Sequence, residues 1–270
     1  MLKDRKSTKI ILLVLVIVLM LIPGFRIFHL RGGLMRESRL TTISRHYASL
    51  GALHIKTTSG DIYIDCDDEN TGVTLNATNA SANDGNTSNI ILSTVSDDIH
   101  VTVGKDHAIN EIRAENISGN IFVDGAVLDI LDLSTVSGNI TVHDAIVDED
   151  LTLSSTSGDM EITGTTSEKL YTSVKSGDLL VDGAATDKLE LTSISGDMKV
   201  IDTAAEDVRL TTTSGNTIFD ADDTYYLDYT SVSGTIDTGN EEYRGTGVMG
   251  NPEAEQKILF KTTSGNLEIL

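Results

Sequence analysis

Apolar and polar residues alternate in short stretches along most of the chain, and these stretches follow one repeated phrase. Its clearest copies lie between Leu131 and Thr238, for example LDLSTVSGNITV (Leu131–Val142) and LELTSISGDMKV (Leu189–Val200). Such alternation is typical of a β-strand with one buried face. Each copy therefore predicts two short strands joined by a Ser-Gly-Asp/Asn bend, because glycine readily adopts the positive φ of a tight turn.

The copies recur at a nearly constant spacing, and the clearest ones are separated by 20, 19, 19, 19 and 19 residues. Weaker copies extend the array in both directions. The ten central positions are Gly60, Asp97, Gly119, Gly138, Gly158, Gly177, Gly196, Gly215, Gly234 and Gly265. Self-similarity at a period near 20 residues is the signature of a solenoid. We therefore predict an all-β, single-stranded parallel β-solenoid (β-helix) of about ten rungs with a roughly 19-residue repeat.

Alignment of the ten copies on the central position indicates which residues face the core. The residue seven before it is always apolar, and the residues two and four after it are apolar in nine copies, with Thr217 and Thr238 as the exceptions. Serine precedes the central position in every copy, so stacked rungs would place these hydroxyls in a ladder that satisfies backbone groups at the bend. The Asp or Asn that follows is expected to hydrogen-bond the local backbone.

Two segments interrupt the regular spacing. The polar stretch 67–89 is expected to be an excursion between rungs. The insertion 239–256 is expected to be a loop that helps to cap the open end of the solenoid, since an uncapped edge invites further strand pairing.

The N-terminal region has a different pattern. Residues 1–9 contain four basic residues and one acidic residue, and an unbroken apolar run of thirteen follows from Ile10 to Ile22. With its flanks, this run predicts an N-terminal hydrophobic helix over 10–25 that acts as an uncleaved signal anchor. A cleaved signal peptide and a buried core segment are the alternatives. We expect a cytoplasmic segment at 1–9, a single-pass anchor at 10–25, a basic juxtamembrane linker at 26–46 and an extracytoplasmic solenoid domain at 47–270.

Charge distinguishes the two parts of the chain. Residues 1–45 contain nine Lys/Arg and two Asp/Glu, whereas the remaining 225 residues contain 11 basic and 39 acidic residues, a formal net charge of −28. Such an acidic surface repels phosphate, so nucleic acid is not an expected partner. The only cysteine is Cys66, which excludes an intramolecular disulfide framework.

We predict no catalytic, cofactor-binding or metal-binding residues. The repeat itself spreads the acidic residues along the surface, so a close carboxylate pair has little diagnostic value. The six histidines lack ligand spacing, and no GxSxG elbow occurs. Calcium is a weak candidate because Asp and Asn oxygens suit it, although the GGxGxD nonapeptide of β-rolls is missing.

The recurrent (T/S)xSG(D/N)(I/L/M)x(V/I) phrase, which ends in KTTSGNLEIL, resembles the bacterial family of predicted adhesins with β-strand repeats, also called the toastrack domain. The resemblance covers most of residues 50–270. It implies a membrane-anchored β-solenoid outside the cytoplasmic membrane, similar to members from cell-envelope stress operons, and it brings no catalytic motif. Our main hypothesis is a non-enzymatic cell-surface binding or scaffold protein whose partner is an envelope polymer or protein. The alternatives are a carbohydrate-active β-helix enzyme that acts on envelope polysaccharide, and a self-assembling structural polymer.

Overall fold

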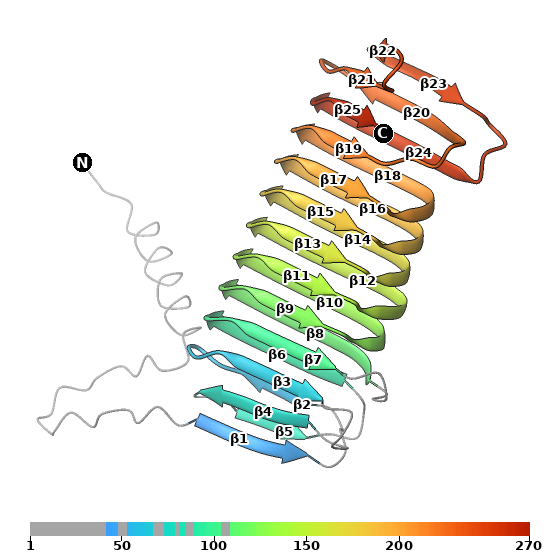
Figure 1. Ribbon diagram of the computed structural model, residues 1–270. Coiled ribbons are helices and arrows are strands. Elements are labelled where there is room, and N and C mark those ends of the chain that lie inside the picture. The colour runs from blue at the N-terminus through green and yellow to red at the C-terminus, as the bar shows by residue number, and fades with distance from the viewer. Residues whose placement is uncertain (1–41, 48–52, 67–72, 79–80, 85–88, 104–108) are drawn as a thin grey trace, which may run out of the picture. The chain divides into compact units, whose positions relative to one another are not determined.

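The computed structural model describes residues 42–47, 53–66, 73–78, 81–84, 89–103 and 109–270 (Figure 1). Within these ranges all the regular secondary structure is β-strand. None of the described residues forms a helix long and apolar enough to cross a membrane. The segment 1–9, the expected helix at 10–25 and most of the linker at 26–46 lie outside the described residues. Strand β1 (Thr42–Tyr47) begins within the last part of that linker.

Two stacked sheets form the solenoid, and the chain passes from one to the other in every turn (Figure 1). One sheet, here called the long-strand sheet, contains strands of 10 to 12 residues in the regular region, and the other, the short-strand sheet, contains strands of three or four. The regular turns are β8 (Ile109–Ser118) with β9 (Ile121–Asp124), β10 (Val127–Ser137) with β11 (Ile140–His143), β12 (Ile146–Ser157) with β13 (Met160–Thr163), β14 (Thr166–Ser176) with β15 (Leu179–Asp182), β16 (Ala185–Ser195) with β17 (Met198–Ile201), and β18 (Ala204–Ser214) with β19 (Thr217–Phe219).

Equivalent residues of successive turns lie directly beside one another. Leu131 pairs with Leu151, Leu151 with Leu170, and Leu170 with Leu189, all in parallel register. The single 20-residue step is absorbed by a register shift between Val147 and Asp150. The predicted parallel β-solenoid is therefore confirmed.

The core lies between the two sheets and consists of the positions that the alternation predicted. The residue seven before the central position is at most 1% exposed in all ten copies: Leu53, Ile90, Ile112, Leu131, Leu151, Leu170, Leu189, Val208, Leu227 and Ile258. Burial of one such side chain contributes roughly 1.5–3 kcal/mol. The exception Thr217 is also buried, and its hydroxyl has no hydrogen-bond partner within the structure.

Each regular turn has two corners rather than the single bend that the sequence analysis recognised. The first corner is the predicted Ser-Gly-Asp/Asn bend, where the glycine φ angles range from +134° to +152° between Gly119 and Gly215. The second corner joins the short strand to the next long strand. It requires φ angles of +47° to +65°, which Gly125, Asp144, Gly164, Gly183 and Asp202 supply. Both corners therefore use backbone conformations in the region that favours glycine.

Antiparallel strands are added at the N-terminal end. Strands β2 (Leu53–Lys56) and β3 (Ile62–Cys66) pair in parallel with β6 (Asn89–Ser96) and β7 (Ile99–Val103), respectively. The expected excursion at 67–89 contains β4 (Val73–Thr78) and β5 (Ser81–Asp84). Strand β4 pairs antiparallel with both β1 and β3, and β5 pairs antiparallel with β2. This part of the segment therefore extends both sheets.

The C-terminal strands stack out of sequence order. Strand β24 (Gln256–Ser264) lies between β18 and β20 (Tyr225–Ser231), and β25 (Leu267–Ile269) lies between β19 and β21 (Ile236–Asp237) (Figure 1). The insertion at 239–256 forms β22 (Glu242–Tyr243) and β23 (Thr246–Gly250), which pair antiparallel with β21 and β20 and end the two sheets. About six successive turns thus form the regular coil. Antiparallel strands separate the two N-terminal copies of the phrase along the chain, and the two C-terminal copies stack out of sequence order. The expectation of about ten rungs is therefore not confirmed.

Candidate functional site

A continuous ladder of Asp and Asn side chains runs along the first corner. In each step a side-chain Oδ1 accepts the backbone N–H of the equivalent residue in the next turn, for example Asp159 from Asp178 and Asp178 from Asp197, both at 2.9 Å. The members from Asp61 to Asn216 are Asp61, Asp98, Asn120, Asn139, Asp159, Asp178, Asp197 and Asn216. The expected local Asx bond is therefore replaced by a bond between turns, which ties each corner to its neighbour.

Buried polar side chains three residues before the central position line the inside of the first corner. Asn116 donates to the Asp97 carbonyl at 2.8 Å, Thr135 to the Gly119 carbonyl at 3.4 Å, and Ser193 to the Gly196 carbonyl at 3.4 Å. The serine directly before the glycine, which the sequence analysis assigned to this task, is exposed in the regular turns. At these three corners a core-facing side chain therefore supplies the donor, whereas Ser155 and Thr212 at the same position have no hydrogen-bond partner in the described residues and Val174 is apolar.

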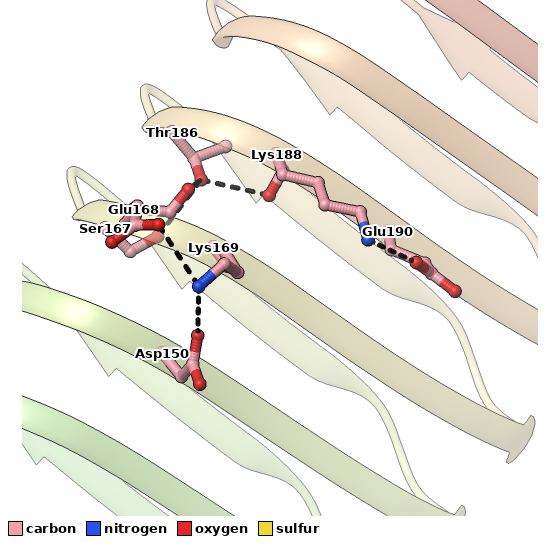
Figure 2. A network of polar contacts seen from close by, with 7 residues as sticks. All are labelled: Asp150, Ser167, Glu168, Lys169, Thr186, Lys188 and Glu190. Carbon is pink, nitrogen blue, oxygen red and sulfur yellow. Dashed lines mark hydrogen bonds and ion pairs between the residues drawn. The ribbon is translucent and has the colours of Figure 1, made fainter.

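The outer face of the long-strand sheet carries ion pairs, of which Lys169–Asp150 joins neighbouring turns while Lys169–Glu168 and Lys188–Glu190 each lie within one strand (Figure 2). Lys169 contacts Asp150 at 3.4 Å and Glu168 at 3.1 Å, and Lys188 contacts Glu190 at 3.2 Å. The hydrogen bond to Glu168 is the largest cause of the raised pKa of Lys169, and the bond to Glu190 is the largest cause of the raised pKa of Lys188. These pairs are exposed and screened by solvent, so they organise the surface more than they stabilise the fold.

Three aromatic side chains are stacked on the outer face of the short-strand sheet. The ring of His100 lies between those of Tyr63 and Phe122, at centroid distances of 4.7 Å on each side and interplanar angles of 5° and 13°. The neighbouring Asp61 carboxylate raises the pKa of Tyr63. The sequence analysis treated His100 as a scattered histidine, although Tyr63, His100 and Phe122 all lie three residues after a central position.

Two adjoining clefts lie at the C-terminal end of the solenoid. The larger, of about 570 Å³, lies on the short-strand sheet and is lined by Asp197, Lys199, Asn216, Ile218, Asp237 and Glu268 among others. The smaller, of about 460 Å³, is lined by Val232, Ser233, Gly234, Thr235, Arg244, Gly245 and Asn266. Thr235 and Asn266 line both clefts. The sequence analysis did not predict these clefts, because their residues come from strands that stack out of sequence order.

Tyrosines gather in the strands around these clefts. The rings of Tyr229 and Tyr243 are 6.2 Å apart, and Tyr243 donates a hydrogen bond to the Glu241 carboxylate. That hydrogen bond is the largest cause of the raised pKa of Tyr243, whereas burial raises the pKa of Tyr225. This end is therefore the most aromatic part of the C-terminal half of the chain.

The acidic residues that the repeat spreads along the surface form no metal-binding cluster in the described part of the chain. Among the residues that the structure describes, no group of three or more His, Cys, Asp and Glu side chains could hold a metal ion. Asp159, Asp178 and Asp197 each use one oxygen in the corner ladder. The expectation of no cofactor, with calcium as the one candidate, stays a prediction.

Residues 85–270 match the family described as Toastrack DUF4097. The chain belongs to this family. The match covers the regular coil and the out-of-order C-terminal strands, so the Toastrack fold in this chain is the parallel β-solenoid described above. Comparisons with curated proteins and with solved structures gave no match.

Proposed function

We propose that this Toastrack chain is a non-enzymatic, membrane-anchored protein whose β-solenoid lies outside the cytoplasmic membrane and acts as a binding or scaffold surface of the cell envelope. The basic segment 1–9 and the apolar run from Ile10 to Ile22 support the anchor. An adhesin and an envelope-stress-associated protein are both forms of this role. The partner is an envelope polymer or an envelope protein, and no nucleic acid is expected, because the surface is strongly acidic.

The observation that carries this proposal is the repetition of side chains on the outer face of the long-strand sheet. Ser134, Ser154, Ser173, Thr192 and Thr211 lie in register on five successive strands, so hydroxyl groups recur at the strand spacing of about 4.8 Å. Beside them lie the ion pairs of Figure 2. A repetitive polar face of this kind suits an extended partner that repeats its own groups, such as a polymer.

The test uses the full chain, expressed in a bacterial host and also purified in detergent. We expect it to fractionate with membranes, to resist carbonate extraction, and to be digested by protease added outside intact protoplasts. The purified chain is expected to co-sediment saturably with isolated cell walls, with and without chelator. Release by carbonate, or protection from external protease, would contradict the anchored, outward-facing arrangement.

A further inference from the structure

The short-strand sheet narrows at its C-terminal end. Its strands have four residues from β9 to β17, then three in β19 and β25 and two in β21. The larger cleft lies across these shortened strands, and the smaller one continues from it around the first corner of the outermost turn. The two clefts together form a groove, here called the terminal groove.

Hydrogen bonds fix the middle of the terminal groove. Asn266 donates from Nδ2 to Oδ1 of Asn216 at 3.1 Å, and its own Oδ1 accepts from Thr235 N and Oγ1 at 2.9 and 3.0 Å. Asn266, Asn216 and Thr235 lie at the corners that precede β25, β19 and β21, which only the out-of-order stacking brings together. The floor is therefore built before a ligand arrives, which reduces the entropic cost of binding.

The groove contains both donors and acceptors around one apolar side chain. Asp197, Asp237 and Glu268 offer carboxylate oxygens, while Lys199 and Arg244 offer N–H groups and make no ion pair in the described part of the chain. Between the two ends lies the half-buried Ile218. A polycation would need acceptors alone and a polyanion donors alone, whereas hydroxyl groups use both.

The charge of the groove supports the same ligand class. Three carboxylates and two basic side chains give a formal charge of −1, whereas residues 46–270 together carry −28. Its 16 lining residues thus carry about half the negative charge per residue of the 225 residues from 46 to 270. Its larger cleft also lies within the size range of small-molecule sites, about 300–1,000 Å³.

We propose that the terminal groove binds a neutral, polyhydroxylated ligand, a short stretch of an oligosaccharide chain. Carboxylates and amides accept and donate hydrogen bonds to the sugar hydroxyls, Lys199 and Arg244 donate at opposite ends, and Ile218 packs against the apolar face of one sugar ring. This inference rests on the proposed binding role and names the ligand class.

The test is calorimetric titration of the full chain, in a detergent without a sugar headgroup, with chitotetraose, cellotetraose, maltotetraose and tetralysine. We expect at least one tetrasaccharide to bind with a Kd on the order of 1 mM or tighter, and tetralysine to bind more weakly. Glu268→Gln, which replaces a charged acceptor by a neutral amide, and Lys199→Ala, which removes a charged donor, should each weaken that binding about ten-fold. The matched control Glu161→Gln changes the same position of a regular turn outside the groove and should leave binding unchanged.

Failure of this inference differs from failure of the proposed function. If no tetrasaccharide binds, if tetralysine binds best, or if Glu161→Gln weakens binding as much as Glu268→Gln, the ligand class is wrong, even where the chain still co-sediments with walls. If a tetrasaccharide binds but the full chain fractionates away from membranes and walls, the ligand class stands and the envelope role is wrong. New reducing ends during the titration would also support the groove as a saccharide site and overturn the non-enzymatic role.

Discussion

At the first corner of each turn glycine lies against the backbone of the preceding turn, whereas at the second corner the space beside it is largely open. A Cβ on Gly177 would lie 2.2 Å from the carbonyl oxygen of Gly158, and one on Gly138 would lie 2.0 Å from that of Gly119. A Cβ on Gly183 or Gly125 would meet nothing closer than 3.7 Å, and one on Gly164 would meet only the end of the Asp144 side chain, at 2.5 Å. The first corner therefore restricts both the conformation and the size of its residue, and the second mainly the conformation.

The residues that replace glycine follow this difference. Asp144 and Asp202 occupy second corners with φ of +51° and +47°, a conformation that Asp reaches at modest cost. The first corner contains one replacement, Asp97, and there the contact between turns is altered. Its carboxylate accepts the Gly60 N–H at 2.5 Å, where regular turns use the carbonyl of the serine before the bend. A side chain is thus accommodated at the first corner where it takes over a hydrogen bond between turns.

The largest expected effect is that of Gly177→Ala. The new methyl group would overlap the Gly158 carbonyl, and φ of +141° is unfavourable for alanine, so two adjacent turns must separate. We expect the free energy of unfolding to fall by about 4 kcal/mol, the upper end of single-residue effects. Urea denaturation followed by circular dichroism measures this change. A loss no larger than that of Gly183→Ala would show that the turns separate easily and that the close approach is unimportant.

The next effect separates the hydrogen bond of the corner ladder from its charge. Asp178→Ala removes the acceptor for the Asp197 N–H and should cost about 1 kcal/mol. Asp178→Asn keeps the Oδ1 acceptor and removes one charge between Asp159 and Asp197, so its stability should equal or exceed that of the parent. The chain itself uses Asn120 and Asn139 in this ladder. Equal destabilisation by both substitutions would mean that the ladder depends on the negative charge.

The first corner was predictable from the sequence and the second was not, although the first occurs in all six regular turns and the second follows five of them. The first combines glycine, a preceding serine and a following Asp or Asn, and steric contact preserves that glycine in nine of ten copies. The second corner has Gly125, Gly164 and Gly183 at the same offset, but Asp144 and Asp202 interrupt the series because the open space tolerates them. Because the second corner accepts either glycine or aspartate, its residues form no clear pattern in the sequence.

The C-terminal end shows a second limit of sequence reasoning. Copies of the repeated phrase form strands with nearly the same edges, so the sequence pattern does not determine which copy pairs with which. The strand pair β24–β25 could equally have followed β20–β21, yet it lies between β18–β19 and β20–β21. The terminal groove depends on this order, because Asn266 bridges Asn216 and Thr235. The fold class was therefore accessible from the sequence, and the candidate site was not.

A smaller effect is expected at the second corner. Gly183→Ala meets no atom closer than 3.7 Å, so only the φ of +65° is unfavourable, and the expected loss is about 1 kcal/mol. The reverse change, Asp202→Gly, relieves the same strain, but the larger unfolded-state entropy of glycine offsets part of this gain, so the stability should rise by only about 0.5 kcal/mol. Thermal denaturation of both variants beside Gly177→Ala measures the contrast. A gain in stability for Gly183→Ala would contradict the conformational argument.

The smallest effect is a loss of stability at alkaline pH, which depends on tyrosine and lysine side chains outside both corners. The pKa values of Tyr63, Tyr225 and Tyr243 are raised above 10.0, and those of Lys169 and Lys188 above 10.5. A raised folded-state pKa contributes stability that is fully present below the ordinary value and is lost as pH rises through the raised one. The melting temperature should therefore begin to fall above about pH 10. Tyr243→Phe, which removes the bond to Glu241, should make this fall shallower, whereas Tyr226→Phe should not, because the Tyr226 hydroxyl bonds no carboxylate in the described residues. An identical fall in the parent and in Tyr243→Phe would contradict a contribution of the Tyr243–Glu241 bond to alkaline unfolding.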